Sequence, residues 1–156
     1  MGKLNNRLKK IFSLTRTQQI MFGVFLILIS IIIFSCQISY FNTWRIDQSE
    51  LSSFFDKTSQ TVNIASKFGA LISHFLIYMM FGVSSLIFSG LIFVSGLTLF
   101  VDANRKKLSE RWFWGLIIMI WFSLFFGHFS TNYLYSGTIG YELNEFLSIY
   151  VGTIGI

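Results

Sequence analysis

The sequence has no proline, a single cysteine and very little charge, and each shortage excludes something. A chain of 156 residues without proline favours long uninterrupted helices, and its twelve glycines are left to make the breaks. One cysteine, Cys36, excludes an intramolecular disulfide and a thiolate metal cluster. Only 12% of the residues are charged, whereas 53% are hydrophobic and 19% aromatic. This composition predicts an all-α fold, a polytopic helical membrane protein.

The sequence also lacks the motifs of common enzyme chemistries. No GxxxxGK[ST] loop is present to hold a nucleotide phosphate. His74 and His128 have no cysteine or carboxylate at metal-ligand spacing, so we predict no metal, no cofactor and no catalytic residue. Asp102, Glu142 and Glu145 lie at the edges of apolar runs and not inside them, where ion pathways place charge. We therefore expect neither an enzyme nor a small-molecule substrate.

Three apolar runs are long enough to cross a membrane, at residues 18–40, 82–101 and 112–130. A helix needs about 20 residues to cross a hydrocarbon core of about 30 Å. The first run is longer than the ~7–15-residue core of a signal peptide, and no small-x-small cleavage site follows it. We therefore favour a transmembrane helix there over a cleaved signal.

The apolar stretch that ends at residue 101 begins before residue 82, and it is too long for one upright span. Gly82 divides it into an interfacial or re-entrant helix over 66–81 and the second span over 82–101. Gly90 and Gly96 in that span let neighbouring membrane helices approach closely. The apolar face predicted for the shorter helix contains Phe68, Ile72, Phe75, Leu76 and Met79.

The tail over 131–156 contains what looks like a second copy of this shorter helix. Placing Gly69 over Gly140 aligns the apolar positions of the two segments, with chance similarity among apolar helices as the alternative. In the second copy, Glu142 and Glu145 lie opposite the apolar face, which predicts an amphipathic helix in the membrane interface.

The bases divide unevenly between the polar segments. Of the twelve Lys and Arg residues, nine fall in the leader over 1–17 and the loop over 102–111, and three fall in the polar loop over 41–65 or just after it. The positive-inside rule therefore predicts a cytoplasmic N-terminus and an outer C-terminal tail in a bacterial-type inner membrane. We expect the clustered bases to face anionic lipid. They are Lys3, Arg7, Lys9, Lys10, Arg105, Lys106, Lys107 and Arg111.

Short motifs occur in a characteristic order along the chain. They are Ile38-Ser39-Tyr40, Lys67-Phe68-Gly69-Ala70-Leu71, Phe81-Gly82-Val83, Gly137-Thr138-Ile139-Gly140 and the turn from Gly152 to Gly155. In this order and spacing the chain resembles the N-terminal four-span membrane region of the FtsK/SpoIIIE family of DNA translocases. The candidate packing and interaction residues are Gly69, Gly82, Gly90, Gly96, Gly137, Gly140, Gly152 and Gly155.

The resemblance implies a membrane anchor placed at the division septum, in cell division and chromosome partition. It implies contacts with lipid, with division proteins and with further copies of the chain, whereas DNA would be reached only through a motor domain. The family continues into a fourth span and an ATPase, so we expect a chain truncated before both. A small polytopic transporter or channel subunit is the alternative.

Overall fold

The computed structural model describes residues 15–51, 56, 61–130 and 132–152. Within these ranges the chain forms helices and short connections and contains no strand, which confirms the all-α prediction. The elements are α2 (Arg16–Leu51), α3 (Ser66–Ser73), the π-helix η1 (His74–Phe81), the 3₁₀-helix η2 (Gly82–Ser85), α4 (Leu86–Val101), α5 (Arg105–Phe129) and α6 (Tyr133–Val151).

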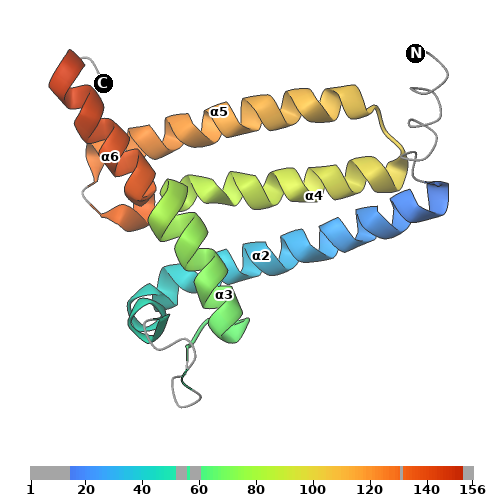
Figure 1. Cartoon of the computed structure of the whole chain (residues 1–156), viewed down its shortest axis with the longest axis horizontal. Coiled ribbons are helices and arrows are strands. Elements are labelled where there is room, and N and C mark those ends of the chain that lie inside the picture. Colours follow the sequence, from blue (N-terminus) through green and yellow to red (C-terminus); the bar gives the residue numbers. More distant parts are fainter. Residues whose placement is uncertain (1–14, 52–55, 57–60, 131, 153–156) are drawn as a thin grey trace, which may run out of the picture.

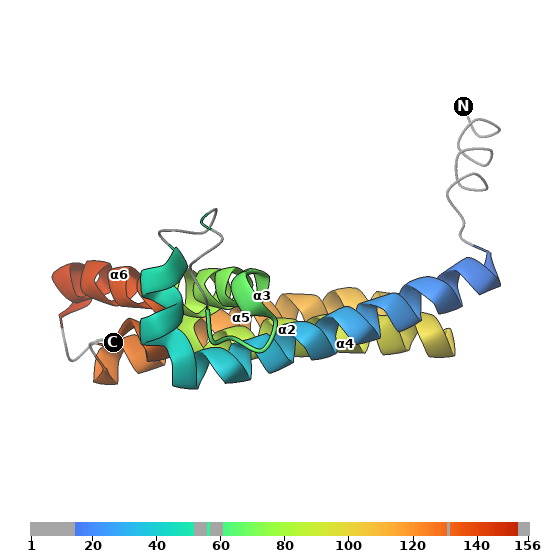
Figure 2. The same cartoon turned by 90° about the horizontal axis from the view of Figure 1, so that it is seen from below.

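The long helices α2, α4 and α5 lie side by side in a row with α4 in the middle, as Figure 1 shows. The helices α3, η1 and α6 gather at one end of this row and cross it at a steep angle (Figures 1 and 2). We call these three helices the cap layer. Among the described residues, three helical stretches are long and apolar enough to span a membrane: Arg16–Leu51, Ser66–Val101 and Lys106–Phe129.

The row of long helices is packed inside out compared with a water-soluble bundle. Large apolar side chains such as Phe25, Ile32 and Trp121 are about half exposed, at 55%, 56% and 57%. Lipid accepts such side chains, and small residues between membrane helices let the backbones approach closely. The buried positions of the row are mostly small or polar: Gly23, Ser30, Ser89, Ser95, Gly96, Thr98, Gly115 and Ser123.

The polar loop predicted over 41–65 is wrong in its first part, because α2 continues as a helix to Leu51. That stretch contains no glycine or proline to end the helix. Its Tyr40 and Trp44 also pack with Tyr78 of the cap layer. Tertiary contacts therefore extend the helix through a sequence whose polar residues suggested a loop.

The basic loop predicted over 102–111 is also shorter than expected. Asp102 adopts a left-handed conformation (φ 61°) that ends α4, and α5 begins three residues later at Arg105. Asn104 caps α5, since its side chain accepts a hydrogen bond from the Lys106 amide. The bases of this segment therefore lie on the first turns of a helix and not in a loop.

Both segments of the predicted repeat are helical, with differences in detail. The segment over 66–81 is α-helical only to Ser73 and then winds as a π-helix to Phe81, and the chain bends at Gly82. Leu76 is buried, unlike the other four residues of the predicted apolar face. In the tail, α6 begins at Tyr133 and has a kink at Gly137, so the motif from Gly137 to Gly140 begins at a break inside a helix.

Candidate functional site

Within the cap layer, the end of η1 contacts α6 at two glycines. Both have backbone conformations that other residues rarely adopt. Gly82 (φ 64°) ends η1, and Gly137 (φ 69°) forms the kink in α6. A Cβ atom on Gly82 would overlap the carbonyl group of Tyr135, and one on Gly137 would overlap that of Met80. The backbone at the bend after η1 therefore packs directly against the backbone of the first turns of α6. We call this contact the glycine joint.

A hydroxyl group reinforces the glycine joint on the π-helical side. Thr138 Oγ1 donates a hydrogen bond of 3.0 Å to the carbonyl oxygen of Tyr78, inside η1. The wider winding of a π-helix breaks the usual backbone pattern, and such segments often mark functional positions. Thr138 follows Gly137 directly, so one turn of α6 both approaches η1 and bonds to it.

Two helices of the cap layer lie against long helices at a glycine. Gly140 of α6 lies against the side chain and backbone of Ser123 of α5, whose hydroxyl donates a 2.6 Å hydrogen bond to the carbonyl oxygen of Ser136. Gly69 of α3 lies against side chains, those of Asn63 and Cys36. The two glycines that the sequence repeat aligned are thus both at close contacts, with different kinds of partner.

A buried carboxylate ties the chain before α3 to the end of α2. Asp47 is fully buried, and its oxygens accept hydrogen bonds from Thr43 Oγ1 (2.5 Å) and from the amides of Val62 (2.8 Å) and Asn63 (3.2 Å). Asn63 Nδ2 in turn donates to the Cys36 carbonyl oxygen. Sequence reasoning missed this role, because the polar setting of Asp47 suggested a solvated loop.

His74 is held in an aromatic cluster. Its Nδ1 lies 2.7 Å from the hydroxyl of Tyr40, and its ring stacks on Tyr78 at 5.1 Å between centroids. Tyr78 also stacks on Trp44, whose ring lies 5.3 Å from the Arg45 guanidinium carbon. Amphipathic aromatic rings of this kind are typical of a membrane–water interface. His128 is exposed at the end of α5.

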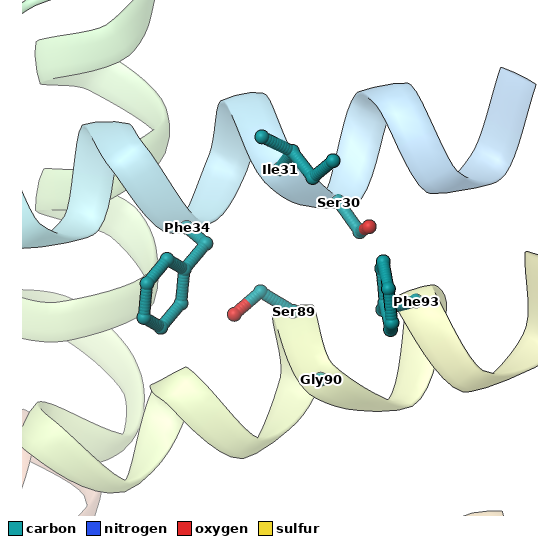
Figure 3. Close-up of a pocket in the computed structure, with 6 residues that line it drawn as sticks. All are labelled: Ser30, Ile31, Phe34, Ser89, Gly90 and Phe93. Atoms are coloured by element: carbon teal, nitrogen blue, oxygen red, sulfur yellow. The ribbon is translucent and has the colours of Figure 1, made fainter.

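The long helices α2 and α4 touch at a pair of glycines. A Cβ on Gly23 would lie 2.8 Å from the Gly96 carbonyl oxygen, and one on Gly96 would lie 2.7 Å from that of Gly23. The helices part further along, leaving a groove of about 260 Å³ between them (Figure 3). Gly90 lines this groove, and a Cβ there would meet nothing within 4 Å.

The end of the row away from the cap layer carries basic side chains, and we call it the basic end. Arg16 donates to the carbonyl oxygens of Leu99 (3.1 Å) and Phe100 (2.6 Å) at the end of α4. The start of α2 and the basic first turns of α5 therefore lie at the same end of the row, with the end of α4 between them, as Figure 1 shows. Lys106, Lys107 and Arg111 are exposed there, and Arg105 begins α5.

Some predicted residues lie outside the ranges that the structure describes: Lys3, Arg7, Lys9, Lys10 and Gly155. Gly152 (φ 74°) follows the last residue of α6, and a Cβ there would meet nothing within 4 Å. Over the described ranges, no three His, Cys, Asp or Glu side chains gather into a group that could hold a metal ion.

Comparison with protein families gives one informative result. The model of a family described as the 4TM region of DNA translocase FtsK/SpoIIIE matches residues 15–156, which is most of the chain. Comparisons with curated proteins and with solved structures gave no match.

Proposed function

The chain belongs to the family of the 4TM membrane region of FtsK/SpoIIIE DNA translocases, and on that premise we propose that it anchors such a translocase and targets it to the division septum. It acts by packing helices in the membrane and by binding other proteins, in cell division and chromosome segregation. The chemistry of DNA movement belongs to a motor domain, so this region itself catalyses nothing.

The observation that carries the proposal is the inside-out packing of α2, α4 and α5. Their buried contacts are made by small residues such as Gly23, Gly96 and Ser123, and their large apolar side chains face outward. Such helices hold a position in a bilayer through the close approach of their backbones. The glycine joint then fixes the cap layer as a firm surface for division proteins or further copies of the chain.

The basic end supports a cytoplasmic position for the N-terminus. Arg16 binds the end of α4 close to where α5 begins, so Arg16 and the basic first turns of α5 lie at one end of the row. By the positive-inside rule this end faces the cytoplasm and its anionic lipid, and the cap layer faces outward.

One observation favours the alternative of a transporter or channel subunit. Gln37 of α2 is fully buried, and its Nε2 donates to Ser85 O and Oγ, both at 3.2 Å. Its Oε1 accepts no hydrogen bond from the described residues. Polar groups inside a membrane often mark a transport path. Gln37 carries no charge, however, and it serves to join α2 to the bend before α4.

A fluorescent fusion in dividing bacterial cells tests the proposal. We expect the tagged chain to concentrate at the septum, and Gly137→Val to keep the membrane signal but lose the septal enrichment, because a side chain there opens the glycine joint. Gly90→Val is the matched control, since a side chain at Gly90 has open space. A uniform membrane signal for the wild-type chain would refute septum targeting and favour the transporter alternative.

A further inference from the structure

An apolar cavity of about 300 Å³ lies beneath η1, against the start of α4 and the middle of α5. We call it the cap cavity. Two of its lining residues, Phe75 and Leu116, are 51% and 37% exposed, so the cavity opens sideways between η1 and α5. Met80, Ser85, Phe88 and Met119 also line it.

The cap cavity extends from the cap layer into the row of long helices. Ser123 marks the level of the cap layer, because its hydroxyl donates to the carbonyl oxygen of Ser136. Leu116 lies seven residues before Ser123 on α5, which at 1.5 Å per residue places it about 10 Å deeper. The cavity therefore reaches from the interface toward the middle of the membrane.

The shape of the cap cavity excludes a protein helix as its occupant. Spreading about 300 Å³ over a depth of about 10 Å leaves a cross-section of about 30 Å². An α-helix with its side chains is ~10–12 Å across and needs more than twice that area. An extended hydrocarbon chain is narrow enough to enter.

The chemistry of the lining excludes water. A buried water needs about two to four polar partners. Ser85 brings the one hydroxyl among the lining side chains, and it already accepts a hydrogen bond from Gln37 Nε2. An empty cavity would forfeit dispersion contacts along its whole lining. Because its open side faces the bilayer, hydrocarbon is the material at hand.

We propose that the cap cavity binds one acyl chain of a phospholipid from the leaflet on the cap side. The head group then lies beside η1 at the membrane surface, and the chain passes between η1 and α5 to the depth of Leu116. The bound lipid fills the space under the π-helix and supports the cap layer from below. This site is independent of septum targeting, and it requires only that the chain is embedded in a membrane.

Native mass spectrometry of the full chain tests the proposal. The protein is reconstituted in vesicles of phosphatidylethanolamine and phosphatidylglycerol, extracted in mild detergent and weighed intact. We expect a wild-type species that carries one phospholipid. Leu116→Trp fills the cavity from its open side. We expect it to reduce the lipid-bound species by about tenfold, because the indole ring occupies the space in which the acyl chain would make its contacts.

Ile117→Trp is the matched control, because Ile117 is a neighbouring exposed residue of α5 (41%) that does not line the cavity. It should retain the lipid. Should Leu116→Trp fail to fold, a second pair tests the opposite wall of the cavity. Phe75→Trp on η1 fills the cavity, and Ile72→Trp on α3 is its control. Equal lipid retention by cavity-filling and control variants would overturn the proposal, as would a wild-type species that carries no phospholipid.

Discussion

At the scale of single residues, Asp47 shows how a buried carboxylate organises the backbone around it. Two of its acceptor contacts are to the amides of Val62 and Asn63, and the contact with Asn63 is buried. A buried amide that loses its partner costs about 1–3 kcal/mol. One side chain therefore fixes the entry into α3.

We predict that Asp47→Ala releases this segment without unfolding the row of long helices. Hydrogen exchange at the amides of Val62 and Asn63 should accelerate by about tenfold or more, the change expected for about 1.4 kcal/mol of lost protection. The amide of Leu134, which bonds to Asn132 Oδ1, should be unaffected. Glu142→Ala serves as the control because Glu142 is exposed. Unchanged exchange at Val62 and Asn63 would contradict the role given to Asp47.

The structural role of a glycine such as Gly82 was easier to predict from the sequence than the hydrogen bonds of a polar residue such as Asp47. Gly82 stood out because an apolar stretch too long for one span had to break, and the structure bends there with a positive φ. Asp47 gave no comparable signal, since its partners are backbone amides 15 and 16 residues away. Gly90 fits the small-residue pattern of a helix contact but faces a groove, because composition does not say which side of a helix meets a neighbour.

At the scale of secondary structure, the helical type of the apolar runs was predictable, whereas the end of α2 and the winding of η1 were not. Apolar runs of about 20 residues predict helices, because a membrane leaves backbone groups no other partners. The π-helix η1 contacts α6, in particular through the hydrogen bond from Thr138 to Tyr78, which is distant in the sequence. The extension of α2 to Leu51 likewise packs against the cap layer.

Thr138→Val tests whether α6 stabilises the π-helix. The change keeps the shape of the side chain and removes the donor to the Tyr78 carbonyl oxygen. We expect a loss of about 0.6–1.5 kcal/mol in the free energy of unfolding, the range for a hydrogen bond in a membrane protein or a protein interior. Unfolding in detergent micelles by a denaturant measures it. Thr138→Ser, which keeps the hydroxyl, should be closer to wild type; equal stability of the valine and serine variants would show that the bond contributes nothing.

At the scale of the whole molecule, a helix of the cap layer lies against a long helix at each of the two glycines that the sequence repeat aligned. Gly69 of α3 meets the side chain of Cys36 on α2, and Gly140 of α6 meets the side chain and backbone of Ser123 on α5. A glycine with positive φ follows η1 and another follows α6, at Gly82 and Gly152. The partners across the two contacts differ, so the sequence repeat did not predict how the segments pack.

The two ends of the molecule allow a direct test of its orientation. If the basic end faces the cytoplasm, a cysteine introduced by Lys107→Cys should react with a membrane-impermeant maleimide only after the cells are opened. A cysteine at Ile64, which is 73% exposed beside the cap layer, should react in intact cells. The native Cys36 is 1% exposed and should give little background, which the unmodified chain measures. The reverse labelling pattern would place the cap layer in the cytoplasm, where it could not meet division proteins on the outer side of the membrane. Because both positions belong to one folded unit, their opposite labelling would fix the direction of all three long helices at once.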